Sequence, residues 1–296
     1  MVHAMAPGTG LSARINAWRF KHAARRHAAA LAPLLSADPT TSTGQGVDAR
    51  PELISFVRAP YLCAGWSPDE RLTHLSTHLA TLDGFPPFNF PLAQSINLMP
   101  LPMISDTYHV VIDKPMWFHR EGVLTINLFD GDWRLFSLVF ALEPVDGGLR
   151  ALIGGIQGRN FDDALDRYRD LTKAANGLRP RDLLIELFRL VCAQLGVTEI
   201  LAIADKGRQN RHPYFGKEMM RTLPLDYDAI WQDRGGQIVN EWFYRLPLTG
   251  DRRSDAEIPA KKRSMYRQRY AMLDAIEAAL KAAWTTMRPV TRPDAL

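Results

Sequence analysis

The chain has 296 residues, of which 46% are hydrophobic and 23% are charged. These are ordinary globular proportions, and a chain of this length can bury a substantial core without metals or disulfides. No apolar run approaches the roughly 18 residues that a bilayer-spanning helix needs, and the formal net charge of +4 is too mild to select among anionic small molecules, acidic lipids and nucleic acid.

The N-terminal segment combines cations with apolar residues and predicts a basic amphipathic helix over Ser12–Leu35 within residues 1–36. A cleaved signal peptide is the weaker alternative, because Pro33 interrupts the apolar stretch. Ala37–Arg50 is polar, without an apolar period, and predicts a linker. Residues 51–290 are then expected to form a single α+β domain. Cys63 and Cys192 are far apart in apolar settings, which is typical of free thiols in a cytoplasmic protein.

The first part of the expected domain is helical. Ser67 followed by Glu70 predicts a capping box at the start of a helix over Pro68–Leu82. Phe85–Asp106 is rich in proline and asparagine, so we expect a long loop with one helical turn.

The next block alternates apolar and polar residues and has short turns at regular spacing. This pattern is typical of an antiparallel meander of about four strands. The expected strands are Tyr108–Ile112, Gly122–Phe129, Trp133–Leu142 and Leu149–Ile156.

The period then becomes helical, with glycines at the expected helix ends. The fold class is therefore α+β, an antiparallel meander followed by helices and mixed strands. The remaining elements expected, in chain order, are the helices Asp162–Asn176 and Arg181–Leu195, the strand Thr198–Ala204, the helix Leu225–Arg234, the strand Gln237–Arg245 and the helix Pro259–Ala283.

A glycine-rich turn at Gly154–Asn160 separates the last strand of the meander from the following helix. Free N–H groups at a helix start form a ready anion site, and Arg159 adds a positive charge. The alternative is a plain strand-to-helix turn that needs glycine. The spacing is neither that of a nucleotide P-loop nor that of a dinucleotide fingerprint. The candidate cofactor-binding residues are Gly155, Gln157, Gly158, Arg159 and Asn160.

A dense basic and aromatic stretch occupies Ile258–Tyr270. On a helix, Lys262, Tyr266 and Arg269 fall on one side, where they could hold phosphate groups. The alternative is a solvated cationic face. Nucleic-acid binding is the weaker prediction, because acidic residues are interleaved and no reader motif is present. The candidate anion-binding residues are Lys261, Lys262, Arg263, Tyr266, Arg267 and Arg269.

Two further segments carry candidate catalytic residues. Asp205 and His212 follow the short apolar strand, and residues at such strand ends often project into a site, although a surface loop is the alternative. Tyr227 belongs to an aromatic-rich piece that lines a pocket or packs in the core. His74 and His78 are four residues apart on one predicted helix, but no third ligand accompanies them, so we expect no metal site.

Several ordered motifs resemble the VirK/YbjX family of bacterial proteins, which is defined by a domain of unknown function. The resemblance covers roughly Pro51–Leu280 and implies a link to virulence and to envelope remodelling, without known catalytic residues. The loop after Asp205 departs from the family pattern, because residues 206–211 intervene before His212. The motifs are RAPYL at 58–62, IGGIQG at 153–158, LTKAANGLRPRDLL at 171–184, LGVTEILAIAD at 195–205, DYDAIW at 226–231, GG at 235–236 and IPAKKRSMYRQRY at 258–270.

The order of the meander, glycine turn, helix and strand also resembles the acyl-CoA half of GNAT-like acyltransferases. That resemblance implies an acyl-thioester donor such as acyl-CoA and an amine or hydroxyl acceptor. Asp205 or His212 would be the base, Tyr227 the proton donor, and the 155–160 amides would hold phosphates. The alternative is a non-enzymatic envelope-pathway protein that binds acidic lipid or a protein partner through its basic segments, at the cytoplasmic side of the inner membrane.

Overall fold

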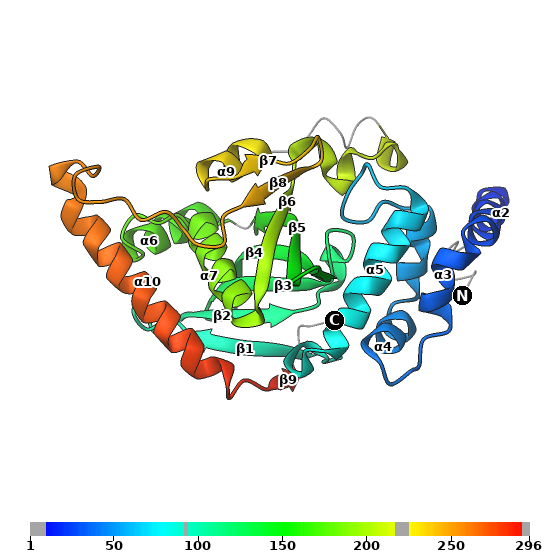
Figure 1. Ribbon diagram of the computed structural model, residues 1–296, viewed down its shortest axis with the longest axis horizontal. Helices are drawn as coiled ribbons and strands as arrows, with labels where there is room; N and C mark the ends of the chain where they lie inside the picture. The colour runs from blue at the N-terminus through cyan, green and yellow to red at the C-terminus, as the bar shows by residue number, and fades with distance from the viewer. Residues whose placement is uncertain (1–9, 92–93, 161, 217–224, 292–296) are drawn as a thin grey trace.

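The computed structural model describes residues 10–91, 94–160, 162–216 and 225–291. Within these residues a mostly antiparallel sheet forms the centre of the molecule, with the strand order β7-β8-β6-β5-β4-β3-β2-β1-β9. Figure 1 shows α6, α7 and α10 at the left of the view and α2 to α5 at the right, and both α5 and α7 contact β4. The α+β class predicted from the sequence is confirmed.

The predicted meander is confirmed, since β2 to β5 pair in sequence, each antiparallel to the next. The expected loop over 85–106 is partly wrong, because it contains β1, which pairs with β2 and with the C-terminal β9. The strands are β1 Gln94–Pro100, β2 Tyr108–Asp113, β3 Leu124–Asp130, β4 Trp133–Val145, β5 Gly148–Gly158, β6 Val197–Ile203, β7 Gln237–Ile238, β8 Phe243–Leu246 and β9 Pro289–Thr291.

The helices follow the predicted order, and the capping box of Ser67 and Glu70 is present at the start of α5. Pro180 opens α7, and Gly196 ends it with a left-handed φ of 70°, as the sequence predicts. The α-helices are α2 Leu11–Arg26, α3 Ala28–Leu35, α4 Ser42–Ala49, α5 Pro68–Asp83, α6 Ala164–Ala174, α7 Pro180–Leu195, α9 Tyr227–Asp233 and α10 Arg263–Trp284. The 3-10 turns are η1 Pro51–Val57, η2 Pro86–Phe88, η3 Met116–Phe118, η4 Asp205–Gly207, η5 Gln209–Arg211, η6 Pro213–Phe215 and η7 Ala260–Lys262.

The N-terminal segment differs from the prediction in two ways. The single expected helix is divided into α2 and α3 at His27. The expected linker contains α4, whose start is capped by the side chain of Thr41 accepting from the N–H of Gly44. Val47 of α4 and Leu31 of α3 belong to the same hydrophobic core as the sheet. The sequence prediction missed α4 because its composition is polar. The helix is stabilised by its cap and by tertiary packing.

Candidate functional site

Strand β5 changes partner along its length. Its first half pairs in parallel with β6, from Leu149 opposite Val197 to Ile153 opposite Ala202. Gly154 is an extra residue on β5, because Phe140 of β4 pairs with Ile153 and the preceding Val139 pairs with Gly155. Such β-bulges bend a strand and often re-aim it beside a site. The half of β5 that follows Gly154 runs on to Gly158 without registered pairs to β6, because β6 ends at Ile203. We call this half the open half of β5.

Tyr227, the first residue of α9, occupies the place beside this open half. Its hydroxyl accepts from the N–H of Ile156 at 2.9 Å and donates to the carbonyl oxygen of Ile156 at 3.1 Å. The end of β6 holds α9 in place, because Trp231 donates from its indole N–H to the carbonyl of Ile203 at 2.7 Å. Burial raises the pKa of Tyr227 above its usual range, so the phenol keeps its proton.

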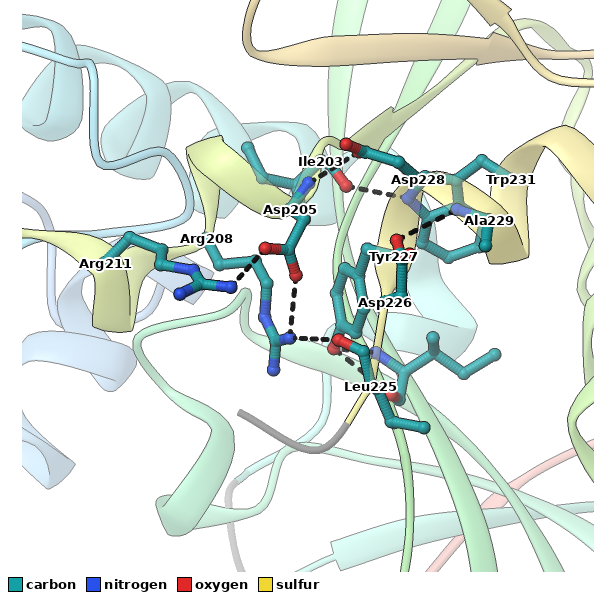
Figure 2. Close-up of polar contacts among 11 residues, drawn as sticks. Ile203, Asp205, Arg208, Arg211, Leu225, Asp226, Tyr227, Asp228, Ala229 and Trp231 are labelled. Carbon is teal, nitrogen blue, oxygen red and sulfur yellow. Dashed lines mark hydrogen bonds and ion pairs between the residues drawn. The ribbon is translucent and has the colours of Figure 1, made fainter. Parts of the chain in front are cut away.

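Asp205 is the centre of an ion-pair cluster directly after β6 (Figure 2). Its carboxylate accepts from Arg208 at 3.2 Å and from Arg211, while its N–H donates to the carboxylate of Asp228 at 2.8 Å. The guanidinium of Arg208 also lies 4.0 Å from the centre of the Tyr227 ring. Because two guanidinium groups bind its oxygens, Asp205 is better suited to orienting these cations than to accepting a substrate proton.

His212 lines a cavity of about 590 Å³ together with Asp205, so the structure brings these two predicted residues together. The Nε2 atom of His212 lies 2.9 Å from the Nη2 atom of Arg71, a group that only donates. Burial and the charge of Arg71 lower the pKa of His212. The imidazole is therefore neutral at pH 7, and Arg71 occupies one of its nitrogens.

Glu121 is a titratable group that the sequence patterns did not single out. It follows η3 and lies against the open half of β5: a Cβ atom on Gly155 would be 2.7 Å from its Oε2 atom. Burial raises the pKa of Glu121 to about 7, and the charge of Arg208 and a hydrogen bond from Gln209 oppose this shift. A carboxyl group that titrates near neutral pH is a strong candidate for acid–base chemistry.

In the described part of the chain, four buried polar atoms without a hydrogen bond belong to Glu121, to its partner Gln209 and to the sequence neighbours of these two residues. Among the described residues, the Oε2 of Glu121, the Nε of Arg120, the Oε1 of Gln209 and the Oδ1 of Asn210 are buried and make no hydrogen bond. Native proteins leave few buried polar atoms unsatisfied, so a group of them needs water or a ligand. We refer to Arg120, Glu121, Gln209 and Asn210 as the Glu121 cluster.

The glycines of the predicted anion-binding turn lie in β5. A Cβ atom on Gly154 would be 1.8 Å from the carbonyl oxygen of Glu121, and one on Gly158 would be 2.5 Å from the hydroxyl of Tyr168. The N–H of Arg159 donates to the carbonyl of Leu135 at 3.0 Å. These positions therefore need glycine for close packing, and the amide of Arg159 is already used.

Gln157, Gly158, Arg159 and Asn160 line a separate cavity of about 510 Å³. One wall of this cavity is Arg134, which donates to Asp113 at 2.7 Å and to Asn127 at 2.6 Å. The structure thus separates these four predicted residues from Asp205 and His212.

The predicted basic stretch lies in a third place, at the N-terminal end of α10. Arg269 donates to the carbonyl oxygen of Asn176 at 2.9 and 3.1 Å and stacks on Tyr266, and both line a cavity beside α7. Arg263 donates to the carbonyl of Ile258 at 3.1 Å. The side chains of Lys261, Lys262 and Arg267 are exposed.

The described residues contain no group of three or more histidine, cysteine or acidic side chains that could hold a metal. His74 contacts Glu143, and His78 accepts from the N–H of Leu142 at 2.8 Å. Burial lowers the pKa of His78 to about 3, and the hydrogen bond with Leu142 opposes this shift. The two histidines therefore serve packing between α5 and β4.

Comparisons with known proteins place most of the chain in one family. Residues 10–282 match a family described as "Protein of unknown function (DUF535)". The chain is 30% identical to the uncharacterized protein YbjX of Escherichia coli over 77% of this chain and 71% of that protein. An uncharacterized protein of Haemophilus influenzae is 38% identical over 49% of this chain and 47% of its own length. A protein named "Membrane protein LapB" from Mannheimia haemolytica is 40% identical over 33% of this chain and 45% of that protein.

The match thus spans about half the length of two of these three relatives. No solved structure matches the chain. Of the helices in the described part of the chain, none is both long enough and apolar enough to cross a bilayer.

Proposed function

The chain belongs to the DUF535 family of proteins of unknown function, which is the VirK/YbjX family, and we propose that it transfers an acyl group from a thioester to an amine or hydroxyl acceptor. One observation carries the proposal. The pairing of β5 with β6 ends after Ile153, and Glu121, with its pKa raised to about 7, lies against the open half of β5 beyond that point.

The topology supports this choice of reaction. An antiparallel meander leads into β5, a helix follows, and the next strand pairs in parallel with β5. GNAT-like acyltransferases insert their thioester where two such strands separate. Because one fold hosts many functions, the proposal depends on the residues at the opening.

Glu121 has the properties of a general base. In its ionised form it would take the proton from the acceptor's N–H or O–H as the acceptor attacks the thioester carbonyl. A new C–N or C–O bond forms, the C–S bond breaks, and the departing thiolate takes a proton from Glu121. Arg208 lies close enough to lower the pKa of Glu121, and its positive charge would stabilise the oxyanion that develops.

Other predicted residues take supporting roles in this proposal. Asp205 fixes Arg208, and Tyr227 occupies the strand opening, so substrate entry would displace its hydroxyl from Ile156. Arg159 and Asn160, which border the neighbouring cavity, are our candidates for the anionic end of a donor such as acyl-CoA.

Thiol release from acyl-CoA donors, followed with a thiol-reactive dye, tests the proposal in the presence of mixed amine and hydroxyl acceptors. Glu121→Gln should lower the rate by about 10²- to 10⁴-fold, the usual contribution of a general base. Glu277→Gln is the matched control, because Glu277 pairs with Lys281 on α10, away from β5. Equal rates for wild type and Glu121→Gln would exclude Glu121 as the base.

A second function is favoured by the surface of α2. Leu11, Ile15 and Trp18 recur every three or four residues and are 75%, 41% and 65% exposed. Cations surround this apolar stripe at Arg14, Arg19, Lys21, Arg25 and Arg26. An amphipathic helix of this composition binds the surface of an anionic bilayer. We propose that α2 holds the protein at the cytoplasmic face of the inner membrane, in keeping with the envelope role implied by the family resemblance.

Flotation with liposomes separates this function from catalysis. Wild type should float with vesicles that contain phosphatidylglycerol and remain unbound with purely zwitterionic vesicles. Trp18→Glu should abolish flotation without changing thiol release. Flotation that persists in Trp18→Glu would exclude the α2 stripe as the membrane contact.

A further inference from the structure

A groove of about 690 Å³ runs along α6, outside the Glu121 cluster. Its α6 wall consists of residues spaced three and four apart, which share one helix face. From Leu165 to Lys173 this wall spans roughly 12 Å, a length comparable to an extended decyl chain. The groove is lined by Phe136, Leu165, Tyr168, Arg169, Thr172, Lys173, Asn176, Gly177, Arg179, Pro180, Arg181, Leu225 and Met265.

The apolar part of the groove contains a large aliphatic side chain, Leu165, that is exposed to solvent. Leu165 is 69% exposed, although it lies beside Tyr168 and Phe136, which stack edge to face on each other. A large aliphatic side chain left exposed beside an aromatic wall is typical of a surface that an apolar ligand covers.

The charged part of the groove has one sign. Arg169, Lys173, Arg179 and Arg181 line it, and no aspartate or glutamate is among its described lining residues. Asp182 binds Arg179 at 3.0 Å and Arg181 at 3.2 Å from outside the groove. Lys173 makes no ion pair with any residue that the structure describes. Positive charge beside a hydrocarbon surface fits an anion that carries an alkyl chain.

We propose that this groove binds a single-chain anionic amphiphile, with the alkyl chain along Leu165 and Tyr168 and the anionic group at Lys173 and Arg181. The assignment goes beyond acyl transfer and does not depend on it, since the groove could hold such a ligand without any reaction. The groove also borders the candidate site: the carbonyl of Leu225, one of its lining residues, accepts from Arg208 at 2.8 Å.

Calorimetry on the full chain with three decyl probes below their micelle concentrations tests the proposal. Decyl phosphate should bind once per chain, and decyl maltoside and decyltrimethylammonium should bind at least tenfold more weakly. Octyl phosphate should bind roughly tenfold more weakly than decyl phosphate, because two methylenes leave the groove. Equal binding of the cationic probe, or no binding of decyl phosphate, would overturn the proposal.

Three variants locate the binding site. Leu165→Glu and Lys173→Glu should each weaken decyl phosphate binding at least fivefold. Both side chains are exposed, so neither change disturbs the core, and far-ultraviolet circular dichroism checks this. Ala174→Glu is the matched control, since Ala174 is exposed on α6 outside the groove. Unchanged affinity in both groove variants would show that the probe binds elsewhere and would refute the assignment.

Discussion

The hydroxyl of Tyr227 makes both hydrogen bonds that a neighbouring strand would make to Ile156, accepting at 2.9 Å and donating at 3.1 Å. A side chain from α9 thus satisfies the backbone of β5 beyond the point where its pairing with β6 ends. This contact links the opening of the sheet to the position of α9 and of Arg208, whose guanidinium stacks on the same ring.

Tyr227→Phe should destabilise the fold by about 1–3 kcal/mol, because a buried N–H and a buried carbonyl group lose their partner. The free energy of unfolding from urea titration measures this effect. Tyr214→Phe is the control, since Tyr214 is 48% exposed and its loss of a hydroxyl should change stability by less than about 0.5 kcal/mol. Equal stabilities of the two variants would show that the Tyr227 contact is dispensable.

The pKa of Glu121, about 7 when folded, makes stability depend on pH. The folded chain binds a proton between pH 4.5 and 7 that the unfolded chain has released, so stability falls as pH rises through this window. The difference in unfolding free energy between wild type and Glu121→Gln should therefore change by up to about 3 kcal/mol from pH 4.5 to 7.5. His78 changes the stability in the opposite direction, because its pKa is lowered in the folded chain. Its contribution is the same in both proteins and cancels in this difference. A difference that does not vary with pH would contradict the raised pKa.

The buried pair of Arg134 and Asp113, at 2.7 Å, predicts strong coupling. Arg134→Met should cost about 3–5 kcal/mol, because the Asp113 carboxylate is left buried without its cation. Adding Asp113→Asn should recover part of that loss, which a double-mutant cycle in urea measures. Additive losses would show that the two side chains are not coupled.

Gly154 of β5 and Gly46 of α4 should respond oppositely to replacement by alanine. Gly154→Ala places a Cβ atom 1.8 Å from a backbone oxygen and should unfold or strongly destabilise the chain. Gly46→Ala should stabilise it by up to about 1 kcal/mol, since Gly46 lies inside α4 with its nearest neighbours at 3.5 Å. Thermal melting of both variants checks the contrast, and a stable Gly154→Ala protein would contradict the close packing of Glu121 on β5.

The sequence correctly predicted those elements that are determined by residues close together in the chain. The alternation of β2 to β5, the Ser67 cap and the Gly196 end are all present. The missed elements depend on distant partners: β1 is paired by β9 from the other end of the chain, and α4 packs against α5. Hydrophobic periodicity does not carry this information.

The candidate site was predictable only in part. Asp205 and His212 follow a buried strand, a position that pointed either to a site or to a surface loop, and the structure places both residues on the lining of one cavity. No sequence pattern marked Glu121, which only precedes Gly122 in an expected turn. Its pKa is set by burial against β5 and by the charge of Arg208, which is far away in the sequence. Gly154 and Gly158 stood out in the sequence as part of a glycine-rich turn. In the structure both positions need glycine because neighbouring atoms pack closely against them.

The pH dependence of thiol release from an acyl-CoA donor tests the central claim most directly. With Glu121 as the base, the rate should rise with pH and level off above an apparent pKa of about 7. Glu121→Gln should lose this rise along with most of the rate. A wild-type rate that does not vary between pH 5.5 and pH 8.5, both values chosen to lie about 1.5 units from that pKa, would contradict the assignment of Glu121.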